Sequence, residues 1–407
     1  MSSLIALLWF SLLTGCLATA STYPESEFDL RARDPDTDLT TPELIAKYGY
    51  PVESHTVQTE DGYILTLHRI PYGKKSSSRT NRPPVLVQHG LLSSSVDWIV
   101  MGPEKGLGYI LADAGYDVWL GNARGNTWSK KHITLSPSQS KFWQFSWHEM
   151  GVYDLPAVID YILERTGEEK LFYIGHSMGT TMFYVMASEK PEYNNKIRAM
   201  FSLAPVAYMS HAGTPFLKAL AFAGDQIGWF TNLMGLNEFL PHTELLTIMG
   251  QMLCRDEAIT QDICNNVFFL INGGYNSKEL DSAMIPVILG HTPAGAATKN
   301  FLHYAQSIKT KKFRQYNYGW LKNLAVYGST TPPKYDMSKI TAPIALMYGM
   351  NDDLGAPGDV ATLNKELPNV ISYYKVADEQ FGHLDFLWAI HGKSLLYNEI
   401  LNLMAKY

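Results

Sequence analysis

A serine lies at the centre of the pattern Gly175-His176-Ser177-Met178-Gly179, with an apolar run before it and a helical pattern after it. A serine on a tight strand-to-helix turn presents its hydroxyl to a substrate, which is the geometry of a nucleophile elbow. The two glycines let the strand and the helix approach where a side chain would clash. The motif alone arises by chance in many chains, but this context favours a catalytic serine over an ordinary glycine-rich turn.

A serine that attacks a carbonyl group needs two hydrogen-bond donors for the negative oxygen that forms. The first donor is expected from the amide of Met178, at the start of the helix. The second usually lies on an early loop that follows a strand. His89-Gly90-Leu91 directly follows the apolar run 85–87, so we expect the Leu91 amide to be this donor. His89 itself is predicted to be a structural hydrogen-bonding residue.

Serine is a weak nucleophile and needs a base, which is oriented in turn by an acid. In chains with this elbow the order is serine, acid, histidine. Asp352 and Asp353 both follow the apolar run 344–348, and the residues alone leave both open as the acid. His383 lies on a glycine-marked turn near the end of the sequence and is the predicted base. His391 is the competitor, and we expect it to be a surface or packing residue.

The elements that must position these residues alternate along the chain. Helical patterns at 155–163 and 180–189 fall between apolar runs of strand type. Such alternation predicts an α/β fold, a mostly parallel sheet with helices on both faces. The functional loops then lie at the carboxyl edge of the sheet. The apolar runs are residues 85–87, 116–120, 171–174, 200–203 and 344–348.

The regular alternation stops between residues 206 and 335, a segment rich in Met, Phe, Leu and Gly. Strand-like runs at regular spacing are missing there, which favours a largely helical cap inserted over the sheet edge. The alternative is further α/β core. The predicted division is a signal peptide at 1–20, a first core part at 21–205, the cap at 206–335 and a second core part at 336–407.

The amino-terminal residues are apolar, but the apolar run that begins at Leu4 is too short to span a bilayer comfortably. Ala18-Thr19-Ala20 matches a signal-peptidase site, so we predict a secretory signal peptide and a secreted protein. The segment has no Lys or Arg, and the alternative is lipidation at Cys16. Removal of the leader leaves Cys254 and Cys264, an even count that suggests one disulfide. The alternative is two buried thiols, and no N-x-[ST] site is present.

Composition excludes several classes of function. The chain has 407 residues, 46% of them hydrophobic, and a net charge of −6. This balance argues against a nucleic-acid partner. The one short basic patch is typical of a solvated helix face or loop, and no later segment has transmembrane character. No metal-ligand spacing occurs, so neither a metal nor a cofactor is expected. The patch consists of Lys309, Lys311, Lys312 and Arg314.

Longer motifs resemble one family along almost the whole chain after the leader. They resemble the acid lipases, the lysosomal and gastric lipase type, within the α/β-hydrolase fold. These strings are far more specific than the elbow alone. The matching motifs are residues 48–51, 59–65, 89–92, 119–126, 145–151, 175–179, 291–295 and 383–386.

The resemblance implies a catalytic triad of Ser177, Asp352 and His383, with the amides of Leu91 and Met178 forming the oxyanion hole. It selects Asp352, because the family pattern has a glycine, two residues and then the acid. It further implies a Cys254–Cys264 disulfide, a cap near 206–335 with a movable lid, and activity at acidic pH. Many members have Gln where this chain has Met178.

The implied substrates are neutral lipid esters, triacylglycerols or cholesteryl esters, at a lipid–water interface. Members of the family are usually N-glycosylated, and the missing glycosylation site favours secretion, with the lysosome as the alternative. Two other functions remain open. One is a carboxylesterase for small soluble esters, although a large apolar insertion favours a lipase. The other is a non-catalytic lipid-binding protein on the same fold.

Overall fold

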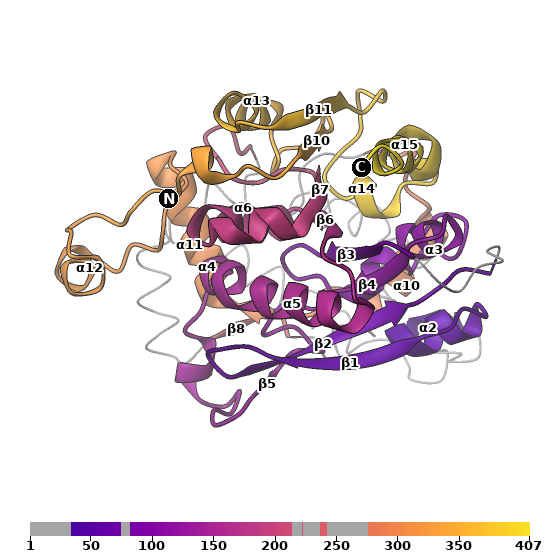
Figure 1. The fold of residues 1–407 in the computed structure, drawn as a ribbon, viewed down its shortest axis with the longest axis horizontal. Coiled ribbons are helices and arrows are strands. Elements are labelled where there is room, and N and C mark those ends of the chain that lie inside the picture. The colour runs from indigo at the N-terminus through magenta and orange to yellow at the C-terminus, as the bar shows by residue number, and fades with distance from the viewer. Residues whose placement is uncertain (1–33, 75–81, 214–221, 223–236, 242–275) are drawn as a thin grey trace, which may run out of the picture.

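The computed structural model describes residues 34–74, 82–213, 222, 237–241 and 276–407. The expected signal peptide at 1–20 lies outside the described residues, and so do Cys254 and Cys264. The described residues form a twisted central sheet between two layers of helices (Figure 1). None of the helices in this part of the chain has the length and apolar character needed to cross a bilayer.

The main sheet has nine strands, in the order β1-β2-β4-β3-β6-β7-β10-β11, with β5 paired to β2. Neighbouring strands are parallel from β4 through β11, whereas β1, β2 and β5 add antiparallel pairs at one side. The five predicted runs correspond to β3, β4, β6, β7 and β10, so the predicted fold class is confirmed. The strands are β1 (Glu53–Gln58), β2 (Tyr63–Ile70), β3 (Pro84–Gln88), β4 (Asp117–Leu120), β5 (Lys131–His132), β6 (Leu171–His176), β7 (Ile197–Leu203), β10 (Ile344–Tyr348) and β11 (Val370–Lys375).

The two edge strands β1 and β11 were not identified in the sequence. Every residue of β3, β4 and β6 is buried, whereas β1 has a single buried residue, Val57. No residue of β11 is fully buried. A parallel strand covered on both faces forms a continuous apolar run, and a partly exposed edge strand does not. The edges therefore lack the pattern that reveals the central strands.

Helices cover both faces of the sheet, and the side chains of the central strands alternate between them. Leu86, Tyr173 and Leu346 point into one apolar cluster, whereas Val87 and Ile174 point into the other. The first cluster is completed by α5 (Leu155–Thr166), α6 (Met178–Glu189) and α13 (Pro357–Glu366). The second is completed by α2 (Thr41–Lys47), α3 (Leu107–Asp113), α14 (Asp385–Trp388) and α15 (Asn398–Met404).

The predicted insertion enters the chain between β7 and β10. Its described residues include a small antiparallel pair, β8 with β9, and three helices. None of its described strands joins the main sheet. The role of the segment as a cap with a lid stays a prediction. The elements are β8 (Glu238–Phe239), α10 (Ile285–Leu289), β9 (Ala296–Ala297), α11 (Thr298–Thr310) and α12 (Trp320–Tyr327).

Candidate active site

Ser177 stands on the tight turn between β6 and α6. Its backbone angles, φ of 53° and ψ of −118°, lie in a region that residues other than glycine rarely adopt. The turn is compact, because a Cβ at Gly179 would lie 2.4 Å from the carbonyl oxygen of Gln88. The Ser177 amide donates to the carbonyl oxygen of Leu203, 3.1 Å away, on the neighbouring strand. The local structure is therefore that of a nucleophile elbow, as the sequence predicts.

Two side chains from the far end of the sequence complete a hydrogen-bonded chain with this serine. The Ser177 hydroxyl lies 2.8 Å from Nε2 of His383 and can donate to it. Nδ1 of His383 lies 2.9 and 3.0 Å from the two oxygens of Asp352. His383 and Asp352 are buried, whereas Ser177 is partly exposed. A base that is aligned by a buried carboxylate and touches a serine hydroxyl can activate that serine.

The structure separates the two candidate acids. Oδ1 of Asp352 also accepts the amides of Leu354, at 2.9 Å, and Gly355, at 2.7 Å, which fix the carboxylate beside His383. Asp353 is exposed, and its carbonyl oxygen accepts the amide of Gly213 at 3.0 Å. Asp352 therefore meets the histidine, and Asp353 does not.

Sequence reasoning missed two residues that position the histidine loop. Nε2 of His176, the variable residue of the elbow motif, donates to the carbonyl oxygen of His383 at 2.9 Å. Burial holds the pKa of His176 well below its ordinary value, so the ring stays neutral and keeps one nitrogen as an acceptor. Asp385 accepts the amide of Gly382 at 2.7 Å and closes the turn on the other side. The contact of His176 spans 207 residues and could not be read from local patterns, whereas that of Asp385 lies within the distinctive turn at 382–386.

The Asp385 carboxyl predicts a pH dependence of stability. Burial raises its pKa to about 7, and the nearby carboxyls Glu279 and Asp378 add to this rise. Its stabilising contribution is fully present below the unfolded pKa near 4 and is lost as pH rises through about 7. We expect Asp385→Asn, which keeps an acceptor oxygen, to remove this dependence. Urea unfolding measured at pH 5 and at pH 8 gives the free energy of unfolding at each pH. Between these two values the free energy of unfolding of the wild type should fall by on the order of 1–3 kcal/mol more than that of the variant. Equal losses in the two proteins would contradict the prediction.

The loop after β3 lies directly against the serine. A Cβ at Gly90 would be 2.9 Å from the Cβ of Ser177, so only glycine permits this approach. His89 fixes the loop, because Nδ1 donates to the carbonyl oxygen of Gly90 at 2.7 Å and Nε2 accepts the amide of Ala123 at 3.0 Å. Burial lowers the pKa of His89 to about 4, so the ring is neutral. These contacts fit the predicted structural role of His89.

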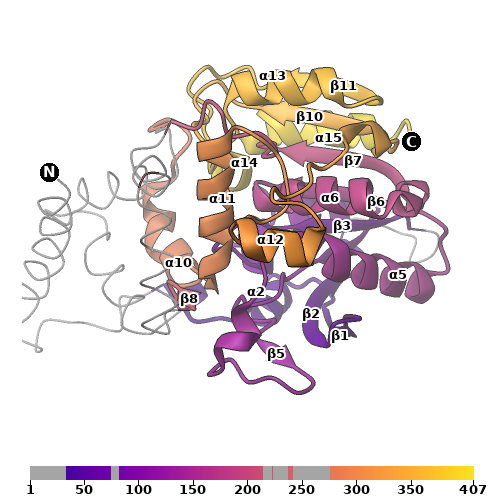
Figure 2. The same ribbon diagram turned by 90° about the vertical axis from the view of Figure 1, so that its left-hand side faces the viewer.

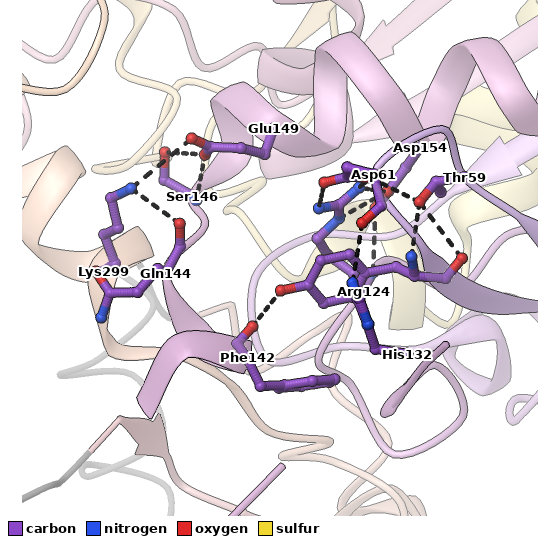
Figure 3. Close-up of polar contacts among 11 residues, drawn as sticks. Thr59, Asp61, Arg124, His132, Phe142, Gln144, Ser146, Glu149, Asp154 and Lys299 are labelled. Atoms are coloured by element: carbon purple, nitrogen blue, oxygen red, sulfur yellow. Dashed lines mark hydrogen bonds and ion pairs between the residues drawn. The ribbon is translucent and has the colours of Figure 1, made fainter. Parts of the chain in front are cut away.

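A buried arginine joins two of the family-like motifs in one polar network (Figure 3). Arg124 donates to Asp61 through both terminal nitrogens, at 2.5 and 2.8 Å, and to Asp154 through Nε at 2.7 Å. Its guanidinium also lies 4.0 Å from the ring centroid of Tyr63. Because Ala123 holds His89, the network braces the loop behind Gly90. Residues 59–65 and 119–126, far apart in sequence, therefore meet in one network.

The competing histidine has no place in this arrangement. His391 is exposed, and its Nδ1 lies 3.0 Å from Glu279, which fits the predicted surface role. Among the described residues, no group of three His, Cys, Asp or Glu side chains could hold a metal ion.

Comparison with known proteins assigns the chain to a family. Residues 83–390 match the model of the alpha/beta hydrolase fold, and residues 41–102 match a partial alpha/beta-hydrolase lipase region. Lipase 3 of Drosophila melanogaster is 45% identical over 365 residues, which cover 90% of this chain and 92% of that protein. Gastric triacylglycerol lipase of Mus musculus is 41% identical over 98% of this chain and 100% of its own length.

A third relative has a different substrate in its name. Lysosomal acid lipase/cholesteryl ester hydrolase of Homo sapiens is 41% identical, over 93% of this chain and 94% of that protein. Among solved structures, an epoxide hydrolase from Vigna radiata covers 88% of this chain and 98% of its own, at 16% identity and a TM-score of 0.49. A likeness at that level carries no argument about function. The family matches and the three lipases together establish that this chain belongs to the acid lipase family of the α/β-hydrolase fold.

Proposed function

We propose that the protein is a lipase that hydrolyses neutral lipid esters, triacylglycerols or cholesteryl esters, through an acyl-enzyme on Ser177. The observation that supports this most is the hydrogen-bonded chain from Asp352 through His383 to Ser177, on an elbow turn. Relatives named as triacylglycerol lipase and as cholesteryl ester hydrolase support the substrate class.

The geometry supports a two-step mechanism. His383 Nε2 takes the hydroxyl proton as the Ser177 oxygen attacks the ester carbonyl, and Asp352 stabilises the imidazolium that forms. The amides of Leu91 and Met178 bind the oxyanion, one from the Gly90 loop and one from the start of α6. His383 then protonates the leaving alcohol. Water, activated by the same histidine, releases the fatty acid and restores the free serine.

Labelling followed by a substrate panel tests this function. A fluorophosphonate reacts with an activated serine, so a labelled Ser177 peptide is expected in a digest of the wild type and not of Ser177→Ala. A non-catalytic lipid-binding protein would remain unlabelled. The panel compares emulsified triacylglycerol and cholesteryl ester with a soluble short-chain ester. A marked preference for the soluble ester would replace the lipase with a carboxylesterase.

The family also leads us to expect an optimum below neutral pH. A histidine base must be unprotonated to act, so an acid optimum requires an altered histidine pKa in the complex or an effect of the interface. A pH–rate profile on emulsified triacylglycerol should peak on the acid side. A peak above pH 8 would contradict the expectation.

The insertion is proposed to act as a cap, with Cys254 and Cys264 joined in a disulfide that shapes its lid. Both cysteines lie outside the described residues, so the proposal depends on their even number and on the family. A non-reduced digest of secreted protein should contain the two peptides linked. Free thiols at both positions would contradict it. Replacement of both cysteines should reduce activity on emulsions more than on soluble esters.

We further propose that the protein is secreted, with the lysosome as the alternative. The expected signal peptide supports entry into the secretory pathway. Relatives named gastric lipase and lysosomal acid lipase represent the two destinations. Fractionation of expressing cells and medium, followed by immunodetection, distinguishes them.

A further inference from the structure

One helix of the insertion projects away from the body of the protein. Helix α12 stands at the end of two connecting segments that lead away from α11, clear of the sheet and its covering helices (Figures 1 and 2). We call residues 311–334, which leave α11 and return toward β10, the α12 arm. Its base is closed by pairing between Arg314 and Lys334 and by the amide of Gln315, which donates to the carbonyl oxygen of Pro333 at 3.0 Å.

The arm exposes an unusual amount of apolar surface. Trp320, Leu321 and Leu324 are 65%, 64% and 51% exposed. They lie within about 100° of the helix circumference, so they form one stripe. Val326 is 53% exposed on another side of the helix. Among the described residues, nine large apolar side chains are exposed, and this one short helix supplies four of them. Exposure of the stripe to water is unfavourable, and contact with an apolar partner would remove this surface from water.

Polar contacts hold the stripe outward. Asn323 is the buried residue of α12, and its amide nitrogen donates to Asn317 Oδ1 at 2.7 Å and to the carbonyl oxygen of Thr330 at 2.9 Å. The Tyr327 hydroxyl donates to the carbonyl oxygen of Tyr316 at 2.8 Å. An isolated helix of this length would be marginal, so these bonds to the flanking chain stabilise it. The inner face is thus polar and occupied, and the outer face is apolar.

All the charged residues of the α12 arm are basic. It contains five basic residues and no acidic residue, although acidic residues outnumber basic ones in the chain as a whole, 39 to 33. A short helix with Trp and Leu on one face and Lys nearby is typical of segments that lie in a lipid–water interface. Basic residues beside such a stripe favour an anionic surface. The basic residues are Lys311, Lys312, Arg314, Lys322 and Lys334.

We propose that the α12 arm is an interfacial anchor that inserts Trp320, Leu321 and Leu324 into a lipid surface bearing anionic headgroups. A second protein copy fits less well, because a stable protein interface needs about 800 Å² from each partner and three side chains of one short helix provide much less. The arm continues α11, whose Tyr304 hydroxyl lies 2.9 Å from Thr181 Oγ1, four residues beyond Ser177. The arm is therefore connected through α11 to α6, the helix that follows Ser177. The role of the anchor in lipid hydrolysis rests on the proposed lipase function, but the binding of the arm to a lipid surface does not.

Vesicle binding tests the anchor directly. The probes are vesicles of phosphatidylcholine alone and of phosphatidylcholine mixed equally with phosphatidylglycerol. The apolar variant is Trp320→Ser/Leu321→Ser/Leu324→Ser, and the charge variant is Lys312→Glu/Lys322→Glu. Ile133→Ser, at a side chain 57% exposed, and Lys406→Glu are matched controls outside the arm.

We expect the wild type to prefer the anionic vesicles and to bind them more weakly at high salt. The apolar variant should lose roughly tenfold or more in affinity for both vesicles, and the charge variant should lose mainly the anionic preference. Both controls should bind like the wild type. The inference fails if the wild type binds neither vesicle or if the apolar variant binds unchanged. It also fails if sedimentation shows a wild-type dimer that the apolar variant abolishes.

Hydrolysis separates this inference from the proposed function. Both arm variants should keep wild-type rates on a soluble short-chain ester and lose activity on emulsified triacylglycerol. A wild type that hydrolyses neither substrate but binds anionic vesicles would refute the lipase and leave the anchor intact. Variants that bind vesicles normally, in an active enzyme, would refute the anchor alone.

Discussion

Ser177→Ala is expected to lower turnover by about four to six orders of magnitude, as in other serine hydrolases. The change removes the attacking oxygen and leaves only binding and the oxyanion donors. The fold should persist, because one partly exposed hydroxyl is lost. The rate is best measured on a soluble short-chain ester, so that the interface does not contribute, with circular dichroism to confirm folding.

A distant serine provides the matched control for this variant. Ser394 is exposed and donates its hydroxyl to the carbonyl oxygen of His391, away from the triad. Ser394→Ala should therefore retain full activity. If Ser177→Ala retained even a tenth of wild-type turnover, Ser177 would not be the nucleophile.

The second large effect is expected at the acid. Asp352→Asn should reduce turnover roughly 10⁴-fold, because an amide neither holds the His383 tautomer nor stabilises the imidazolium. Asp353→Asn should remain within about tenfold of wild type, since its exposed side chain lies outside the triad. The two variants are neighbours of identical chemistry, so each controls for the other. Both are assayed on the same soluble ester after folding has been checked.

The reverse result has a clear meaning. An inactive Asp353→Asn beside an active Asp352→Asn would place the acid one residue later than the structure has it. Loss of activity in both would indicate that the loop after β10 tolerates neither change, and thermal denaturation would then show a loss of stability. Rates close to wild type in both would exclude a carboxylate partner for His383 at this loop.

The central part of the fold could be predicted because buried parallel strands are locally distinctive. Apolar runs make up most of β3, β6 and β10, and each strand is followed by a residue of the candidate site or its loop. The edge strands β1 and β11 have no such run, since solvent contact permits polar residues there. The nucleophile elbow could also be predicted from the sequence, because its glycine, serine and glycine fall within five consecutive positions.

Other parts of the site depend on contacts that no local pattern reports. His176 holds the histidine loop across 207 residues of sequence, and Arg124 binds Asp61 across 63. The choice between Asp352 and Asp353 needed the family pattern, because side-chain direction on a loop is set by the chain around it. The arm was visible only as a basic patch, since its exposed stripe depends on how residues 311–334 leave the body.

The distance along the chain between the residues of the candidate triad has a consequence for biosynthesis. Ser177 and His383 are 206 residues apart, and the whole segment between β7 and β10 is made before either Asp352 or His383. Synthesis proceeds from the amino terminus. The candidate nucleophile is therefore synthesised long before its candidate base. A nascent chain that has not reached residue 383 therefore cannot activate Ser177 through the proposed triad.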